Sequence, residues 1–218
     1  MDFDQQRVKL VERLEKLGYV KTEAISRAML KVKREMFVTE DRYSDAYADY
    51  PLPIPGHVSI SAPHMHAIFM SALKLKDGDK VLEIGAGSGI LLAYMKEVVG
   101  EKGQVFGTEI IPETYEFAKN NLKEAGYDNV KLFLADGSKG LSEFSPFDKI
   151  ISSASSPENI PKPWIDQIKI GGIIVTPIGP EGGYQDLYYF EKKDGKLIKK
   201  NLGGVLFVNL IGEFGFKE

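Results

Sequence analysis

The chain has 218 residues, no cysteine and a formal net charge of −3 at pH 7. The absence of cysteine excludes disulfides, thiol catalysis and thiolate metal sites. Basic residues are dispersed and no apolar run is long enough to cross a bilayer, so we expect neither nucleic acid nor membrane as a partner. The acidic amino terminus lacks the pattern of a secretory signal, which predicts a cytoplasmic protein.

The length and a hydrophobic content of 43% are sufficient for one substantial core. We expect a single domain over residues 1–218. Within it, residues 1–76 supply helices and a segment that approaches the site, and residues 77–218 form the α/β core.

The first third of the chain predicts three helices. Apolar residues at helical spacing run from Gln5 to Leu17, and a second helix begins near Thr22 and ends before Phe37. The stretch from Tyr43 to Pro55, rich in tyrosine and proline, predicts an ordered loop. A third helix follows Pro63, with Ser61 as its expected N-cap.

From Gly78 onward, strand and helix patterns alternate, which predicts a parallel sheet covered on both faces. Ligands of such sheets bind at the carboxyl ends of the strands. The expected strands are Lys80–Ile84, Gln104–Glu109, Val130–Leu134, Phe147–Ser152 and Gly172–Pro177, and the expected helices are Leu91–Val98, Pro112–Ala125 and Pro161–Lys169, with a short piece near Leu141.

The carboxyl-terminal part predicts three short strands. Asp186–Lys192 and Leu197–Lys200 flank Asp194-Gly195, a strong hairpin signal, and Val205–Ile211 forms the last strand. The expected fold is therefore α/β: a doubly wound, mostly parallel, Rossmann-like sheet with amino-terminal helices and an antiparallel carboxyl-terminal end.

A glycine-rich turn follows the first strand of this core. Gly85, Gly87 and Gly89 alternate, which permits a sharp turn and close approach of a ligand to the backbone. A dinucleotide fingerprint needs glycine where Ile90 stands, so that match fails. The form that begins at Glu83 resembles the first motif of S-adenosylmethionine-dependent methyltransferases, in which an acid near the turn suits the ammonium and sulfonium of the cofactor. A plain connecting turn is the alternative.

Two further acids end strands. Glu109 ends the second strand, where a carboxylate can accept hydrogen bonds from both hydroxyls of a ribose. Asp136, followed by Gly137, ends the third strand, beside the expected position of the adenine. Each acid alone is explained as a solvated strand-end residue, but together with the glycine turn both predict cofactor contacts.

The histidines of the chain, His57, His64 and His66, lie close together in sequence and raise the question of a metal. Residues two apart on a helix point to different sides, and neither cysteine nor an acidic cluster accompanies them. We therefore expect no metal site.

Four stretches resemble the protein-L-isoaspartate O-methyltransferase family. They are Ser61–Ala67 (Ser-Ala-Pro-His-Met-His-Ala), Leu82–Leu91, Ile165–Gly172 and Gly203–Gly215. The resemblance implies S-adenosylmethionine as cofactor, isoaspartyl-containing proteins and peptides as partners, and a monomer. It implies an active-site role for Ser61 and substrate contacts from Ser59, Ile60, His66, Asn209 and Leu210.

The resemblance implies methylation of the free α-carboxylate of an isoaspartyl residue. It leaves open whether D-aspartyl residues are also methylated. The ester closes to a succinimide, and hydrolysis returns some normal aspartate. A carboxylate is already ionised at neutral pH, so the site needs alignment and no strong base. Ser61 would hold one carboxylate oxygen by a hydrogen bond.

The chain departs from the usual family pattern at several positions. Ser152–Ser156 is unusually rich in serine, Asn209 replaces a usual proline, Phe216 a common tryptophan, and His57-Val58-Ser59 a frequent Gly-Gln-Thr. Two other functions stay open: a methyltransferase acting on RNA or a small molecule, and a binding module whose transfer site has decayed.

Overall fold

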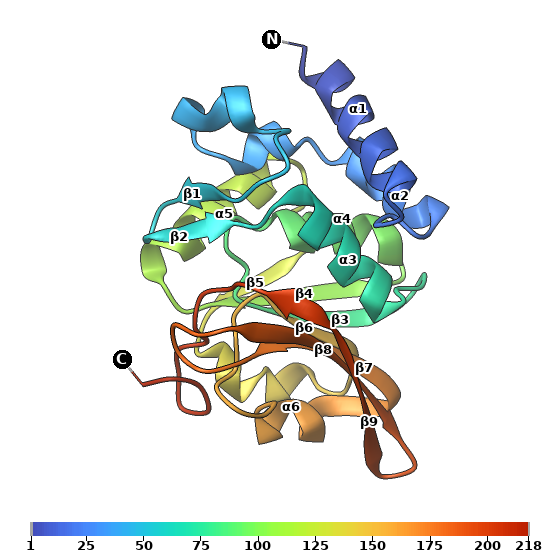
Figure 1. Ribbon diagram of the computed structural model, residues 1–218, viewed down its shortest axis with the longest axis vertical. Helices are drawn as coiled ribbons and strands as arrows, with labels where there is room; N and C mark the ends of the chain where they lie inside the picture. Colours follow the sequence, from blue (N-terminus) through green and yellow to red (C-terminus); the bar gives the residue numbers. More distant parts are fainter. Residues whose placement is uncertain (1, 218) are drawn as a thin grey trace.

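A seven-stranded sheet in the order β5-β4-β3-β6-β7-β8-β9 runs through the molecule (Figure 1). The structure is a computed structural model and describes residues 2–217. Strands β3 to β7 are parallel, whereas β8 is antiparallel to both neighbours, as predicted. The strands are β3 (Lys80–Ile84), β4 (Gln104–Glu109), β5 (Lys131–Leu134), β6 (Phe147–Ser152), β7 (Ile168–Ile178), β8 (Gln185–Lys193) and β9 (Lys196–Val205).

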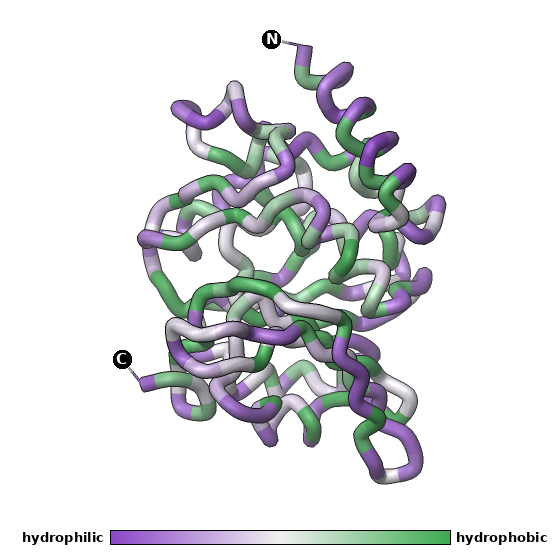
Figure 2. The backbone as a smooth tube through the Cα atoms, in the orientation of Figure 1, coloured by the Kyte–Doolittle hydropathy of each residue, from purple (hydrophilic) through white to green (hydrophobic). Residues whose placement is uncertain are grey.

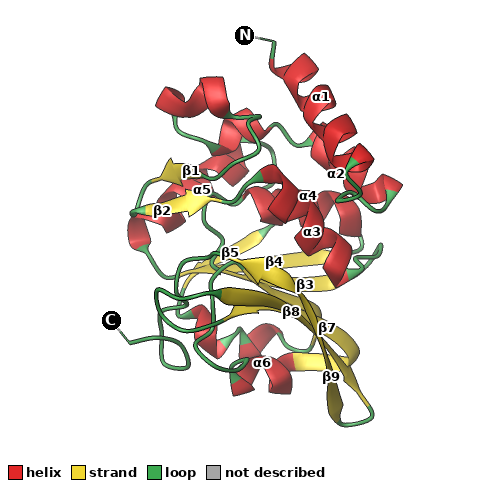
Figure 3. Cartoon of the chain, in the orientation of Figure 1, coloured by secondary structure: helices red, strands yellow, loops and turns green. Residues whose placement is uncertain are grey.

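Helices cover both faces of the sheet (Figure 3). Helices α3, α4 and α5 lie over one face with α1 and α2 beyond them, and α6 lies on the other face. The α-helices are α1 (Phe3–Lys16), α2 (Glu23–Lys31), α3 (Pro63–Leu73), α4 (Ile90–Val99), α5 (Pro112–Glu124) and α6 (Lys162–Gln167), and the 3₁₀ turns are η1 (Arg34–Phe37), η2 (Glu40–Asp45), η3 (Gly137–Lys139) and η4 (Ser142–Phe144).

The amino-terminal helices form where the sequence predicts them. Gly18 has φ +75° directly after the C-cap of α1, a left-handed conformation that glycine adopts without a steric penalty. The Thr22 hydroxyl accepts a hydrogen bond from the Ile25 N–H and caps α2. The predicted end of α1 and the predicted start of α2 are thus confirmed, whereas α2 ends at Lys31 and the residues before Phe37 form η1.

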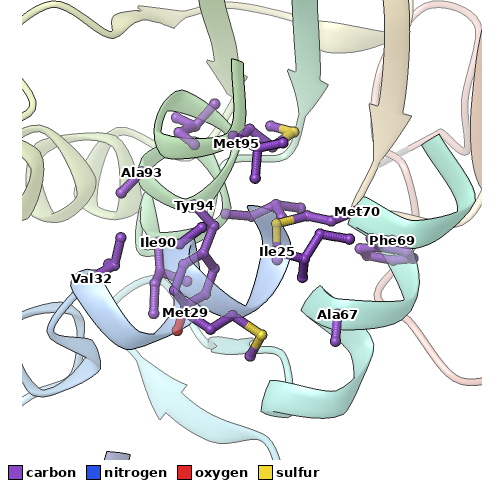
Figure 4. Packing of buried hydrophobic residues seen from close by; sticks show 14 of the residues in the cluster. Ile25, Met29, Val32, Ala67, Phe69, Met70, Ile90, Ala93, Tyr94 and Met95 are labelled. Atoms are coloured by element: carbon purple, nitrogen blue, oxygen red, sulfur yellow. The ribbon is translucent and has the colours of Figure 1, made fainter. Parts of the chain in front are cut away.

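The hydrophobic core lies on both sides of the sheet. One cluster joins the amino-terminal helices to α4, where Met29 of α2 and Met70 of α3 pack near Tyr94 (Figure 4). The second cluster surrounds Trp164 of α6, which is fully buried. Along the chain, hydrophobic segments concentrate in the interior while hydrophilic ones mark α1 and the β8–β9 hairpin (Figure 2). Among residues 2–217, no helix is long and apolar enough to cross a membrane.

The prediction of an irregular loop over Tyr43–Pro55 is wrong in part. Its start belongs to η2, and its end forms β1 (Leu52–Ile54), which pairs with β2 (Val58–Ile60) in an antiparallel hairpin. The three-residue turn between the paired Ile54 and Val58 has φ +89° at Gly56 and +59° at His57, a conformation that is common for glycine and uncommon for other residues. Tyrosine and proline obscured this short pairing.

The predicted carboxyl-terminal hairpin is confirmed, but the third strand predicted after it is wrong. Two long strands, β8 and β9, form the hairpin at Asp194-Gly195, and β9 ends where Val205–Ile211 was expected to begin a new strand. Among the described residues, the chain beyond β9 makes isolated bridges between Asn209 and Ser155 and between Ile211 and Phe216. Val208, Leu210 and Ile211 line the candidate site instead of a strand ladder, whereas Phe207 stacks on Phe69, and a sequence pattern does not distinguish these arrangements from a strand.

Candidate active site

The order of the strands reverses at β3. From β3 the chain moves outward to β4 and β5, and β6 then returns to the other side of β3. At the carboxyl ends of these strands lies a cavity of about 600 Å³. The cavity therefore lies at the place where doubly wound sheets bind their ligands. Its walls come from the turns after β3 to β6, from β2 and the start of α3, and from residues 208–211.

The glycine turn after β3 forms the floor of the cavity. Gly85 and Gly87 line it, with φ +76° and +55°. The Gly85 N–H donates to the Thr108 carbonyl and the Gly87 N–H to Glu109 Oε2, at 2.9 and 3.0 Å. Gly89 lies outside the lining and is the N-cap of α4; a Cβ there would stand 3.0 Å from Leu122 Cγ. Because Gly89 has no side chain, α4 can pack closely on α5.

Glu83, the residue before the last in β3, is a buried acid that lines the cavity. Its Oε1 accepts a hydrogen bond from Ser153 Oγ at 3.0 Å, and its Oε2 has no partner within residues 2–217. Burial raises the pKa of Glu83 well above its usual value, against the hydrogen bond from Ser153, and nearby Glu109 raises it further. An unpaired buried carboxyl oxygen fits a cationic ligand group such as the cofactor's ammonium.

Glu109 ends β4 and lies 6% exposed on the cavity wall. Its carboxylate accepts hydrogen bonds from the N–H groups of Ile111, Gly87 and Ile110 at 2.9 to 3.1 Å. Burial raises its pKa, and these hydrogen bonds oppose that rise. The backbone thus fixes an acid at the position expected to contact a ribose.

Asp136 and Gly137 follow β5, but only Gly137 lines the cavity. The Asp136 carboxylate accepts hydrogen bonds from the N–H of Glu213 and from the N–H and hydroxyl of Ser138. Burial opposes its ionisation, yet these bonds outweigh burial and lower its pKa. Asp136 therefore ties the carboxyl-terminal segment to the turn after β5 and lies outside the cavity lining.

Ser61 lines the cavity at the junction of β2 and α3. The prediction that it caps α3 is wrong, because the N-cap is Ala62, which supplies no side-chain hydrogen bond. Asp49 performs that task from the preceding segment: its Oδ1 accepts from the His64 N–H at 3.0 Å and contacts His64 Nδ1 at 2.8 Å. The Ser61 hydroxyl makes no hydrogen bond within the described chain and is available to a ligand.

His66 of α3 also lines the cavity, as do Ser59 and Ile60 of β2. It is 4% exposed and its ring lies 5.8 Å from the Tyr94 ring. Burial lowers the pKa of His66 well below its usual value, and the charges of Arg34 and His64 lower it further. The imidazole is therefore neutral at pH 7.

The serine-rich segment after β6 supports the remaining wall. The Ser155 N–H donates to the Val208 carbonyl and the Leu210 N–H to the Ser155 carbonyl, at 2.8 and 2.9 Å. These bonds hold Asn209 and Leu210 against the cavity. The Phe216 N–H in turn donates to the Leu210 carbonyl at 2.7 Å. Within this segment Ser155 thus has a defined structural role, whereas the buried hydroxyl of Ser156 has no hydrogen-bond partner in residues 2–217.

Sequence reasoning missed Ser88 and Thr108. Both line the cavity and are buried, and the Ser88 hydroxyl has no partner in residues 2–217. Ser88 lies inside the glycine motif, so its position was the available signal, whereas nothing in the sequence distinguished Thr108. Within the same residues, no group of three or more histidines, cysteines or acids is placed to hold a metal ion.

Known proteins resemble the chain over nearly its whole length. Curated protein-L-isoaspartate O-methyltransferases of Methanopyrus kandleri and Pyrococcus horikoshii are 46% and 49% identical to it. The aligned regions cover 99% and 95% of this chain and 96% and 94% of those proteins.

Two solved structures share the fold in detail. One, a protein-L-isoaspartate O-methyltransferase, has a TM-score of 0.88 at 35% identity, over 96% of this chain and 67% of its own. The other, from Plasmodium falciparum and described as the same type of enzyme in complex with S-adenosyl-L-homocysteine, has a TM-score of 0.84 at 30% identity, over 94% and 98%. A sequence profile of the protein-L-isoaspartate(D-aspartate) O-methyltransferase family matches residues 5–215, and the chain belongs to that family.

Proposed function

We propose that the cavity at the end of β3 holds S-adenosylmethionine on the glycine turn and presents Ser61 to the α-carboxylate of an isoaspartyl residue. The protein is an S-adenosylmethionine-dependent protein-L-isoaspartate O-methyltransferase that acts in protein repair. The observation that carries the assignment of roles is that Ser61 and the cradle formed by Gly85, Gly87 and Glu109 line one cavity.

The residues of the cradle fit the cofactor. Glu83 Oε2 and Ser88 Oγ are buried without a partner in residues 2–217, which suits the ammonium and carboxylate of its amino-acid end. Glu109 suits the ribose, and the turn at Gly137 the adenine. The bound cofactor supplies an activated methyl group on a sulfonium.

The protein's own task is to align an acceptor that is already a nucleophile. A carboxylate is ionised at neutral pH, so no side chain has to remove a proton. The Ser61 hydroxyl donates to one carboxylate oxygen and leaves the other directed at the methyl carbon. Transfer of a methyl group from a bound sulfonium to this oxygen would cancel two opposite charges, which an enclosed cavity favours over water. Ser59, Ile60, His66, Asn209 and Leu210 provide the acceptor side of the wall.

Replacing Ser61 by alanine tests this assignment. We expect Ser61→Ala to lower kcat about 10- to 100-fold, because the acceptor oxygen loses its alignment. Affinity for S-adenosylhomocysteine, measured by calorimetry, should stay within about twofold, since the cofactor rests on other residues. An unchanged kcat, or an equal loss of cofactor affinity, would contradict the role given to Ser61.

A further inference from the structure

The fully buried side chain of Arg34, at the start of η1, contacts the backbone of Ser61. Its Nη2 donates to the Ser61 carbonyl at 2.9 Å, and its Nε donates to the Ala46 carbonyl at 2.8 Å. The guanidinium therefore joins the segment after η2 to the junction of β2 and α3. Arg34 does not line the cavity, so it acts from behind Ser61.

The charge of Asp49 and the side chains of Tyr94 and Tyr47 favour a cation there, but burial outweighs them. Within residues 2–217 no carboxylate lies within ion-pair distance of Arg34, and its Nη1 has no hydrogen-bond partner. Burial lowers the pKa of Arg34, which means that enclosing this charge costs stability. A hydrophobic side chain of similar volume would fill the space at less cost. Such a side chain could not donate the two hydrogen bonds that Arg34 makes to the Ala46 and Ser61 carbonyls.

A planar guanidinium fixes two carbonyls relative to each other because its donors are held in a rigid fork. Asp49 restrains the same turn by accepting a hydrogen bond from the His64 N–H. The Ser61 backbone is thus held at its carbonyl by Arg34 and, three residues later, by Asp49. Its hydroxyl needs no protein partner to keep its place.

We propose that Arg34 is a positioning residue for methyl transfer: by holding the Ser61 carbonyl, it fixes the Ser61 hydroxyl at the acceptor carboxylate. This inference rests on the proposed role of Ser61. Arg34 contacts neither substrate nor cofactor in this proposal. Loss of Arg34 therefore disturbs the alignment of the acceptor carboxylate in the transition state. The effect therefore falls on kcat more than on KM or cofactor affinity.

The test compares Arg34→Lys and Arg34→Met with a matched control. Lysine keeps a charge but cannot reproduce the fork, and methionine removes both. The control is Lys96→Met, which removes another buried cation that donates to two carbonyls, those of Gly100 and Gly103, at the far end of α4. We expect both Arg34 variants to lose about tenfold or more in kcat per folded molecule. The control should lose stability and keep kcat.

A double-mutant cycle distinguishes positioning from general damage. If Arg34 acts through the Ser61 hydroxyl, adding Arg34→Lys to Ser61→Ala lowers kcat by less than twofold further. Additive losses would overturn the inference, as would a kcat for folded Arg34→Lys within twofold of the parent. If Ser61→Ala itself leaves kcat unchanged, the proposed function of Ser61 fails, and that result is separate from either outcome for Arg34. Thermal melts and circular dichroism establish the folded fraction, and Arg34→Lys keeps the comparison valid should Arg34→Met not fold.

Discussion

At the scale of single residues, Glu83 combines a stability cost with a binding role. Its carboxyl is buried, its Oε2 is unpaired in residues 2–217, and burial raises its pKa. A carboxyl with a raised pKa in the folded state favours the fold below the unfolded value, near 4.3, and loses that contribution as the pH rises through the folded value. Replacement by glutamine therefore removes a penalty that grows with pH.

We expect a cationic ligand group to reverse this shift in the pKa of Glu83. Binding of S-adenosylhomocysteine should then release protons from Glu83 into the buffer, and less so as the pH rises. Calorimetry in buffers of different ionisation enthalpy measures this release. Glu83→Gln should bind the ligand about tenfold more weakly and without that release, since the charge pair is lost. Equal proton release by the parent and Glu83→Gln would exclude this role.

His66 has the opposite linkage. Burial lowers its pKa, so the folded state favours the neutral ring, and stability is lost as the pH falls from about 6.5 through the lower folded value. His66→Gln should reduce the drop in melting temperature between pH 7 and pH 5. The comparison must be with the parent chain, because Glu83 and Glu109 contribute with the opposite sign. The same acid-induced drop in both proteins would show that His66 is not the group responsible.

At the scale of elements, the glycines of the turn after β3 have different tasks. A Cβ at Gly87 meets only Ile54 Cδ1 at 3.8 Å, whereas one at Gly89 meets Leu122 Cγ at 3.0 Å and the Ala118 carbonyl at 3.3 Å. Gly18, with φ +75° and open space around it, supplies a control for backbone strain alone.

Alanine at each of these glycines should separate strain, packing and binding. Gly18→Ala and Gly87→Ala should each cost about 1 kcal/mol of unfolding free energy, and Gly89→Ala more, because α5 must also move. Of the three variants, only Gly87→Ala should lose more free energy of S-adenosylhomocysteine binding than free energy of unfolding, since Gly87 lines the cavity. Urea unfolding and ligand titration measure both quantities. Equal stability losses for Gly87→Ala and Gly89→Ala would refute the packing role of Gly89.

The same scale shows where sequence patterns succeed. The parallel strands and main helices follow from strong periodicity and from caps such as Thr22, because local signals and tertiary packing agree there. The β1–β2 hairpin was missed because its strands have three residues each and His57 occupies a position with positive φ. The cap from Asp49 joins residues 15 apart in sequence, a distance that no local motif records.

At the scale of the whole molecule, the site depends on segments far apart in the chain. Strand ends of the sheet supply the cradle, and their convergence follows from topology alone. The acceptor side combines β2 and the start of α3 with residues 208–211, and only the family resemblance linked them in advance. The Arg34 contact with Ser61 had no sequence signal. A single domain and a monomer stay predictions.

The most direct test of the account is methyl transfer to matched peptides. An isoaspartyl peptide, its aspartyl twin and an RNA substrate are each incubated with the protein and labelled S-adenosylmethionine, and labelled product is followed with time. We predict methyl ester only on the isoaspartyl peptide, followed by its conversion to succinimide and then to some normal aspartyl peptide. Comparable labelling of the aspartyl twin, labelling of RNA, or no transfer to the isoaspartyl peptide would contradict it.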